Sequence, residues 1–145
     1  MDETMVRDKA RGFMDALHAL EQDETGGEGS LDALVDLYAA DARLTNAALR
    51  LTGEERVGTE AIRSFWKDYK KTLGKSYSDF HQVTVNGEAA GLFWVTRGTN
   101  SHGDENAAAY DGVTLLVFEE SGKIRQFQGY YDTHQFNLAI GIQKA

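Results

Sequence analysis

Cysteine and proline are both absent from this chain of 145 residues, and basic side chains are scarce relative to acidic ones. The absence of cysteine excludes a disulfide framework, a thiolate nucleophile and a cysteine-ligated metal. With 15 basic and 23 acidic residues the formal net charge is −8, which argues against nucleic acid as a partner. A protein that binds a phosphate backbone needs a basic face.

Long apolar runs are also missing. No run approaches the roughly 18 residues that a membrane-spanning helix needs, and the start, MDETMVRDKARG, has no apolar signal core. We therefore expect a cytoplasmic protein that makes no membrane contact. The chain has 41% apolar and 26% charged residues, which is typical of a soluble globular protein, and its length suits one domain over residues 1–145.

Several catalytic and cofactor motifs do not occur. The four histidines share no spacing typical of a zinc site, and neither HExxH nor GxSxG is present. The glycine-rich residues 26–29 follow a predicted helix rather than a strand, which does not favour a dinucleotide site. We expect no metal site and no cofactor.

Apolar residues at three- and four-residue steps predict three amphipathic helices. The first covers residues 3–21, the second begins after a cap at Ser30 and has Tyr38 in its apolar stripe, and the third begins at Thr59 and ends at Gly74.

Residues that favour β-structure predict strands over residues 43–51, 77–85, 88–99, 107–119 and 123–131. Hairpin turns are expected at Asn86-Gly87, at residues 100–106 and at Ser121-Gly122. Asp132, with Gln135 three residues later, is typical of a helix start and predicts a short C-terminal helix. This order of elements predicts an α+β domain whose helices cover one face of a curved sheet.

Four segments in this order resemble the nuclear transport factor 2-like superfamily: FMDAL at 13–17, LYAADARL at 37–44, VGTEAI at 57–62 and GKI at 122–124. Within it, the chain is most similar to the SnoaL-like and limonene-epoxide-hydrolase-like branches. The resemblance implies a cone-shaped, cystatin-like fold: a strongly curved sheet of mixed or antiparallel strands wraps around the three helices. It also implies an apolar pocket at the open end and pairing into homodimers.

Despite the resemblance, the chain lacks the complete set of catalytic residues of the ketosteroid isomerases. Phe13 stands where those enzymes have a tyrosine donor, and Asn46 stands where they have the aspartate base. Their third position, a protonated acid, falls near Val113 or Thr114. An amide cannot abstract a proton, so this machinery is absent as a set.

The residue set of the epoxide hydrolases is incomplete too. Asn46 and Arg97 match their asparagine and arginine, whereas Leu44 replaces the tyrosine. Thr99 and Gly129 replace the two aspartates. Without these carboxylates the chain lacks a base for water and an acid for the epoxide ring.

Two neighbouring strands carry the candidate catalytic residues. Alternation places Phe93 with Arg97 on one face and Asp111 with Val113 on another, and the resemblance implies that both faces line the pocket. A carboxylate in an apolar pocket can have a raised pKa and act as general base or acid, so Asp111 and Arg97 are the predicted catalytic pair. Alternatively, the two form a structural pair at the rim, or Asp111 lies in water.

The last strand supplies the remaining predicted substrate contacts. Phe127, Gly129 and Tyr131 share the face expected to line the pocket, and Phe13 and Asn46 join them. Gly129 either leaves room for a ligand or accommodates sheet curvature. Tyr131 and Asn46 could donate hydrogen bonds to a ligand carbonyl, or Tyr131 could be a core aromatic residue.

The opposite sheet face would then carry Trp94, Leu116 and Phe118, an apolar area that needs a cover and predicts a homodimer through that face. Two functions stay open. One is a pocket protein that binds a small, largely apolar, carbonyl-containing molecule, with cofactor-independent isomerisation, cyclisation or hydration by acid/base chemistry. The other is a non-catalytic ligand-binding or dimerisation module of the same fold.

Overall fold

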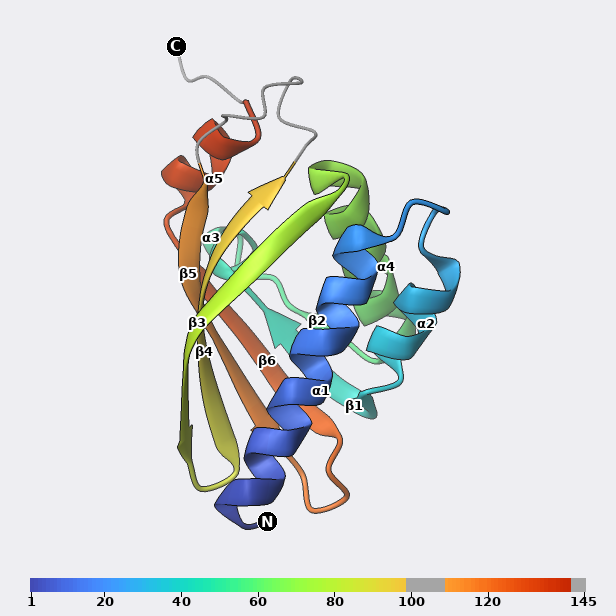
Figure 1. Cartoon of the computed structure of the whole chain (residues 1–145), viewed down its shortest axis with the longest axis vertical. Coiled ribbons are helices and arrows are strands. Elements are labelled where there is room, and N and C mark those ends of the chain that lie inside the picture. Colours follow the sequence, from blue (N-terminus) through green and yellow to red (C-terminus); the bar gives the residue numbers. More distant parts are fainter. Residues whose placement is uncertain (99–108, 142–145) are drawn as a thin grey trace.

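A computed structural model describes residues 1–98 and 109–141, and in them a curved sheet wraps around helices (Figure 1). The helices are α1 (Glu3–Gln22), α2 (Glu28–Val35), α3 (Ala47–Leu51), α4 (Thr59–Leu73) and α5 (Thr133–Ala139). The strands are β1 (Tyr38–Thr45), β2 (Arg56–Val57), β3 (Ser76–Asn86), β4 (Ala89–Gly98), β5 (Tyr110–Phe118) and β6 (Ile124–Tyr131). The predicted α+β fold, with its N-terminal helices and short C-terminal helix, is confirmed.

The described strands form one six-stranded sheet in the order β2-β1-β6-β5-β4-β3. β1 runs parallel to β6, and every other neighbouring pair is antiparallel, so the sheet is mixed. The pairing register shifts between Phe80 and Gln82 in β3 and between Val117 and Phe118 in β5. Such irregularities bend a strand and increase its twist, which helps the sheet curve around α1.

Helix α1 lies across the concave side of the sheet (Figure 1). The Asp2 carboxylate caps it by accepting the Met5 N–H at 2.8 Å. Its predicted apolar stripe is buried, and it includes Phe13 and Leu17. Because this stripe packs against β3, β4 and α2, the helix forms the floor of the space that the sheet encloses.

Two predicted element boundaries were wrong. Helix α2 begins after Gly27, with Ser30 inside it, and ends before Tyr38, which starts β1 beside Ile124 of β6. Pairing with β6 therefore overrides the helical spacing of Tyr38. The predicted strand over 43–51 stops at Thr45 because the Asn46 side chain accepts the Leu49 N–H at 2.8 Å and starts α3.

The hairpin at Asn86-Gly87 is confirmed, with Asn86 paired to Ala89. The turn expected at 100–106 lies outside the described residues. Asp132 caps α5 as predicted by accepting the His134 N–H at 2.8 Å. The Gln135 side chain does not reach back to Asp132, because its oxygen accepts the N–H of Asp111 at 3.2 Å.

The sheet faces of β4 and β5 are the reverse of the prediction. Trp94, Leu116 and Phe118 point toward the helices and are at most 7% exposed, so they belong to the core rather than to an outer surface. Phe93 and Val113 lie on the opposite, partly exposed face. Both faces of these strands are apolar, so a period of two in the sequence does not tell which face is inside.

Among residues 1–98 and 109–141, no helix is both long enough and apolar enough to cross a membrane.

Gly112 makes room for the Trp94 ring. The two residues are paired across β4 and β5, and a Cβ on Gly112 would lie 2.2 Å from the Tyr130 carbonyl oxygen and 2.8 Å from the indole. A backbone oxygen in a neighbouring strand cannot move aside without shifting that strand. The indole Nε1–H donates to the Thr114 hydroxyl at 2.9 Å, which fixes the ring in this place.

We expect Gly112→Ala to lower the free energy of unfolding by about 2 kcal/mol or more, because the added methyl group overpacks this contact. The control is Gly12→Ala, since Gly12 lies within α1 and has nothing within 4 Å of an added Cβ. That change should raise stability by about 0.5–1 kcal/mol through helix propensity. Urea unfolding measures both, and equal stability of the two variants would contradict the packing described for Gly112.

Candidate functional site

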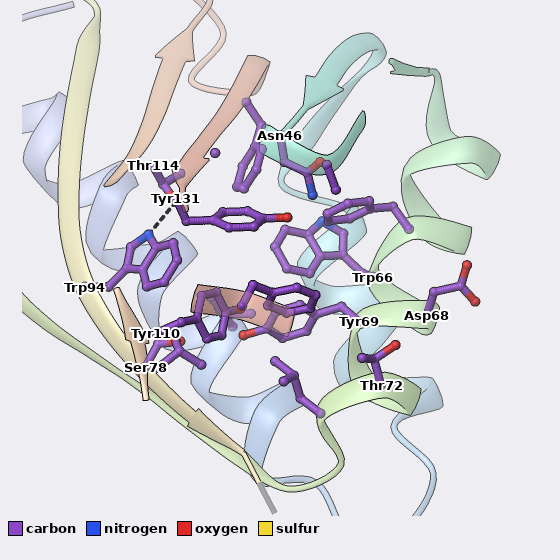
Figure 2. Close-up of a pocket in the computed structure, with 18 of the residues that line it drawn as sticks. Asn46, Trp66, Asp68, Tyr69, Thr72, Ser78, Trp94, Tyr110, Thr114 and Tyr131 are labelled. Carbon is purple, nitrogen blue, oxygen red and sulfur yellow. Dashed lines mark hydrogen bonds between the residues drawn. The ribbon is translucent and has the colours of Figure 1, made fainter. Parts of the chain in front are cut away.

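A cavity of about 270 Å³ lies between the concave sheet face and helices α1, α3 and α4 (Figure 2). Its lining is mainly aromatic, and the polar groups among the described lining residues are few. The aromatic side chains that line it are Phe13, Phe65, Trp66, Tyr69, Phe80, Trp94, Tyr110, Phe127, Tyr131 and Phe136. Such a lining, with a small number of placed polar groups, is typical of a site for a small organic molecule.

One wall of the cavity is a set of edge-to-face rings from β4, β5, β6 and α5. Tyr110 stands at its centre, with ring centroids 5.2 Å from Trp94, 5.6 Å from Tyr131 and 4.9 Å from Phe136. These separations suit attraction between the edge of one ring and the face of the next. The wall therefore holds its shape without a ligand.

The opposite wall joins α1, α4 and β6. The Trp66 ring lies 6.2 Å from Phe13 and 5.5 Å from Phe127, with the latter pair perpendicular. Trp66 also donates its indole N–H to the buried Tyr38 hydroxyl at 3.2 Å. Phe13 and Phe127 thus line the cavity as predicted, and their role in binding a substrate stays a prediction.

At one end of the cavity lie Asn46, Gly129 and Tyr131, all three of which line it as predicted. The Asn46 side-chain oxygen caps α3, so its amide nitrogen is left to point into the cavity (Figure 2). Burial raises the pKa of Tyr131, and the Ala48 N–H and the charge of Arg50 offset part of this rise. Tyr131 therefore keeps its hydroxyl proton at neutral pH and can donate it.

Gly129 allows α3 to approach β6. A Cβ on Gly129 would lie 3.3 Å from the Asn46 Cβ, tighter than an ordinary contact. Arg50 completes this junction by donating to the Gly129 carbonyl oxygen at 2.7 Å and by lying 4.3 Å from the Tyr130 ring centroid. The glycine thus makes room for the residue that starts α3, which in turn brings the Asn46 amide to the cavity.

At the other end of the cavity stands a polar network that the sequence prediction missed. Glu21 of α1 is fully buried, and its carboxylate accepts hydrogen bonds from the Tyr69 hydroxyl at 2.6 Å and from the Ser78 N–H at 3.0 Å. The Ser78 hydroxyl lies 2.5 Å from the same carboxylate and 2.7 Å from the Thr96 hydroxyl. Tyr69, Ser78 and Thr96 all line the cavity.

A signal for this network was present in the sequence. Glu21 continues the four-residue series of Phe13 and Leu17, so it stands on the buried stripe of the first helix. A carboxylate on such a stripe needs buried donors, and those donors lie on α4 and β3. Their positions depend on the tertiary fold.

The tyrosines near Glu21 are held in their neutral form. Burial is the main cause that raises the pKa of Tyr69 and of Tyr110, and the negative charge of Glu21 raises both further. A neighbouring anion and a dry environment both disfavour a phenolate.

The rim of the cavity holds its other charged groups. Asp68 of α4 is exposed, and its carboxylate turns away from the cavity (Figure 2). Arg56 of β2 forms an ion pair with Glu54 at 3.4 Å. Among the described lining residues, no carboxylate or imidazole therefore points into the interior as a direct general base.

The predicted catalytic pair is not brought into the cavity. Arg97 and Asp111 are both exposed and neither lines it, because they stand on the outer face of β4 and β5. Phe93 and Val113, predicted as substrate contacts, pair with each other across these strands and also lie outside the cavity. The prediction that these four residues face the pocket was wrong for the reason given above, since both faces of the two strands carry apolar residues.

Among the described residues, no group of three or more histidine, aspartate or glutamate side chains is placed to hold a metal ion.

The buried tyrosines predict loss of stability at high pH. Burial raises the pKa of Tyr38, Tyr69, Tyr110 and Tyr131 above the ordinary value of 10.0. The unfolded chain therefore releases these protons at a lower pH than the folded protein does. The stabilisation that the four protonated tyrosines contribute is fully present below about pH 10 and is lost as the pH rises through their raised pKa values. We expect the free energy of unfolding in urea to fall steeply above about pH 10.

Tyrosinate absorbance, recorded together with near-ultraviolet circular dichroism, provides the check. The ionisation of these four residues should coincide with the loss of the aromatic dichroism signal. Ionisation of all 6 tyrosines of the chain while that signal persists would contradict the burial described here.

Comparison with solved structures shows the same fold in proteins of low sequence identity. An NTF2-like protein of unknown function from Burkholderia pseudomallei K96243 has a TM-score of 0.76 and 18% identity, with 97% of this chain and 98% of that chain covered. A candidate ketosteroid isomerase from Kribbella flavida DSM 17836 has a TM-score of 0.67 and 17% identity, with 89% and 78% covered. TerC, co-crystallised with polyporic acid, has a TM-score of 0.74 and 14% identity, with 94% and 98% covered.

Comparison with curated protein sequences finds no significant match. The family model of the SnoaL-like domain, in contrast, matches residues 10–127, which is most of the chain and includes the larger part of α1, the predicted pocket residue Asn46 and the first part of β6. The SnoaL-like resemblance inferred from the sequence is therefore confirmed, and the chain, whose fold is NTF2-like, belongs to the SnoaL-like family.

Proposed function

We propose that this protein binds a small, largely apolar molecule that carries a carbonyl or similar acceptor oxygen. The observation that carries this proposal is the aromatic cavity of about 270 Å³ with two hydrogen-bond donors, Asn46 and Tyr131, at one end. A ligand would bury apolar surface against the rings and orient itself through the donors, which is how small-molecule sites combine affinity with specificity.

Asn46 and Tyr131 suit an acceptor oxygen because both have a proton to give. The Asn46 side-chain oxygen is occupied by the Leu49 N–H, which leaves its amide nitrogen as the cavity-facing group. The raised pKa of Tyr131 keeps its phenolic proton at neutral pH, so the hydroxyl can donate it to a ligand. Two donors from adjoining elements can hold one carbonyl oxygen in a defined place.

Binding without catalysis is the favoured function. The donors could polarise a carbonyl, but acid/base chemistry also needs a group that takes a proton from the ligand. Among the described lining residues, the only carboxylate belongs to Asp68, which is exposed and turned away. The alternative of a non-catalytic ligand-binding module is thus better supported than catalysis by Asp111 and Arg97, which are exposed on the outer sheet face.

Proteins of similar fold lend support to a small-molecule ligand. TerC was crystallised with polyporic acid, and the Kribbella flavida protein is a candidate ketosteroid isomerase. At 14% and 17% identity these likenesses show the fold, so the chemistry proposed for this chain rests on its own cavity residues.

The test is a ligand panel of steroids, polyketide-like aromatic ketones, terpenoid epoxides and polyporic acid, read as the rise in melting temperature. At least one carbonyl-containing member should bind. For that ligand, we expect Tyr131→Phe to weaken binding about tenfold through the lost hydrogen bond. Asn46→Asp, which keeps an oxygen to cap α3 but replaces the donor by a carboxylate, should weaken binding at least as much.

The matched control is Tyr130→Phe, because Tyr130 is exposed on the outer face of the same strand and its hydroxyl donates to Gln128 at 2.5 Å. Its binding constant should equal that of the unaltered protein. A panel without any binder, or equal effects of the substitutions at 130 and 131, would argue against the proposed function.

We also propose that two copies pair through the outer sheet face, with different residues from those predicted. The partly exposed apolar side chains on this face are Phe93, Val95, Val113, Leu115 and Val117. They form a continuous apolar surface across β4 and β5. Pairing of two copies would remove this surface from water, which favours association. Trp94, Leu116 and Phe118 cannot serve because they are in the core.

Leu115→Glu should shift the protein to a monomer in sedimentation velocity at micromolar concentration, because a charge would be buried in the interface. The control is Leu51→Glu, since Leu51 is 74% exposed on α3 and lies away from this sheet face. That variant should keep the sedimentation coefficient of the original protein. A monomeric original protein at micromolar concentration would exclude this pairing.

A further inference from the structure

The buried Glu21 carboxylate has no ion-pair partner among the described residues. Its exposed fraction is 0%, and three donors satisfy it: the Tyr69 hydroxyl, the Ser78 N–H and the Ser78 hydroxyl. The Lys70 ammonium group donates to the Glu21 backbone oxygen at 3.0 Å and is attracted by the Glu21 charge, without an ion-pair contact to the carboxylate. Three hydrogen-bond donors thus converge on the carboxylate oxygens, while Lys70 binds the backbone of the same residue.

The hydrogen bonds of this network all run toward Glu21. Ser78 has a single hydroxyl proton, and the carboxylate takes it, so the Thr96 hydroxyl must donate to the Ser78 oxygen. The Tyr69 proton also goes to the carboxylate. The oxygens of Tyr69 and Thr96, both cavity-lining residues, therefore have only lone pairs to offer at this end of the cavity.

The two ends of the cavity are thus opposite in polarity. At the Asn46 and Tyr131 end, N–H and O–H groups offer protons, whereas at the Glu21 end the Tyr69 and Thr96 oxygens can only accept them. Between the ends stand the rings of Trp94 and Tyr110, whose faces attract positive charge and whose edges form the wall described above. The raised pKa of Tyr69 and of Tyr110 is consistent with the charge of Glu21 acting on the groups at this end.

We propose that the Glu21 end of the cavity takes a protonated amine of the ligand, so that the ligand class is an apolar ring compound with a cationic nitrogen. This inference rests on the proposed function, since it concerns the same cavity, and it adds the charge of the ligand and its orientation in the cavity. The nitrogen donates to the Tyr69 and Thr96 oxygens, while an acceptor group of the ligand lies toward Asn46 and Tyr131.

A cationic group binds more favourably at the Glu21 end of the cavity than a neutral hydrogen-bond donor does. It approaches Glu21 from the cavity side, where no described cation lines the interior, and charges interact more strongly in a dry aromatic cavity than in water. An anion of the same shape would meet repulsion from Glu21 and would face oxygen lone pairs instead of donors. The cavity therefore discriminates by charge through a residue that no ligand touches directly, which makes Glu21 a positioning residue.

The test uses three probes of one shape: 2-naphthylmethylamine as the cation, 2-naphthylmethanol as the neutral donor and 2-naphthoate as the anion. Isothermal titration calorimetry at neutral pH measures their dissociation constants with the full-length protein. We expect the amine to bind most tightly, the alcohol less tightly, and the carboxylate at least about tenfold more weakly than the amine.

Glu21→Gln keeps the size of the side chain and removes its charge, so it should bring the constants of amine and carboxylate to within about twofold of each other. Asp15→Asn is the control, because Asp15 is exposed on the same helix and its loss changes the net charge equally. That variant should keep the full preference for the amine. Urea unfolding shows whether each variant is folded before its binding is measured.

The outcomes separate the two proposals. If the alcohol binds but the amine binds no more tightly than the carboxylate, the charge preference is wrong and the ligand-binding function stands. If Glu21→Gln keeps the preference, or Asp15→Asn loses it, Glu21 is not its cause and the inference fails. If none of the three probes binds, the charge preference fails, and the ligand panel described above decides the ligand-binding function separately. Should Glu21→Gln not fold, the order of the three constants in the unaltered protein decides alone.

Discussion

The hydrogen bonds of the Glu21 carboxylate are the interaction on which the cavity depends. They join the end of α1 to Tyr69 on α4 and to Ser78 on β3, so three elements meet at one buried charge. A buried carboxylate without these donors would cost several kcal/mol. The helices and the sheet edge must therefore keep their positions to satisfy it, and the space between them stays open beside the aromatic rings.

Two glycines in the curved sheet make space for residues that line the cavity. Gly112 lets the Trp94 ring lie over β5, and Gly129 lets α3 approach β6. Because neither glycine has a side chain, a neighbouring residue can lie close to it and line the cavity: Trp94 beside Gly112 and Asn46 beside Gly129. The Trp94 ring then packs edge to face with Tyr110 at 5.2 Å, which gives the cavity a wall that does not rely on a ligand.

The polarity of the cavity follows from these two constraints. Where α3 begins, the Asn46 oxygen is used as a helix cap and its amide nitrogen remains for a ligand. Where α1 ends, the donors are all used by Glu21 and their oxygens remain. The hydrogen bonds that each polar group makes within the fold thus decide which of its atoms faces the cavity, and the proposed ligand chemistry follows from those atoms.

The sequence by itself determined the order of the longer elements, the helix cap at Asp132, the hairpin at Asn86-Gly87 and the family, because spacing and turn chemistry are local properties. It also placed Phe13, Asn46, Phe127, Gly129 and Tyr131 at the cavity. It missed the short elements α3 and β2.

Only the tertiary structure decided which faces of β4 and β5 look inward. Both faces are apolar, so packing against Tyr110 and the other rings of the cavity wall placed Trp94 inside and left Arg97 and Asp111 outside. It alone also brought Tyr69 and Ser78 to Glu21, because these donors are 48 and 57 residues away along the chain and no local pattern connects them.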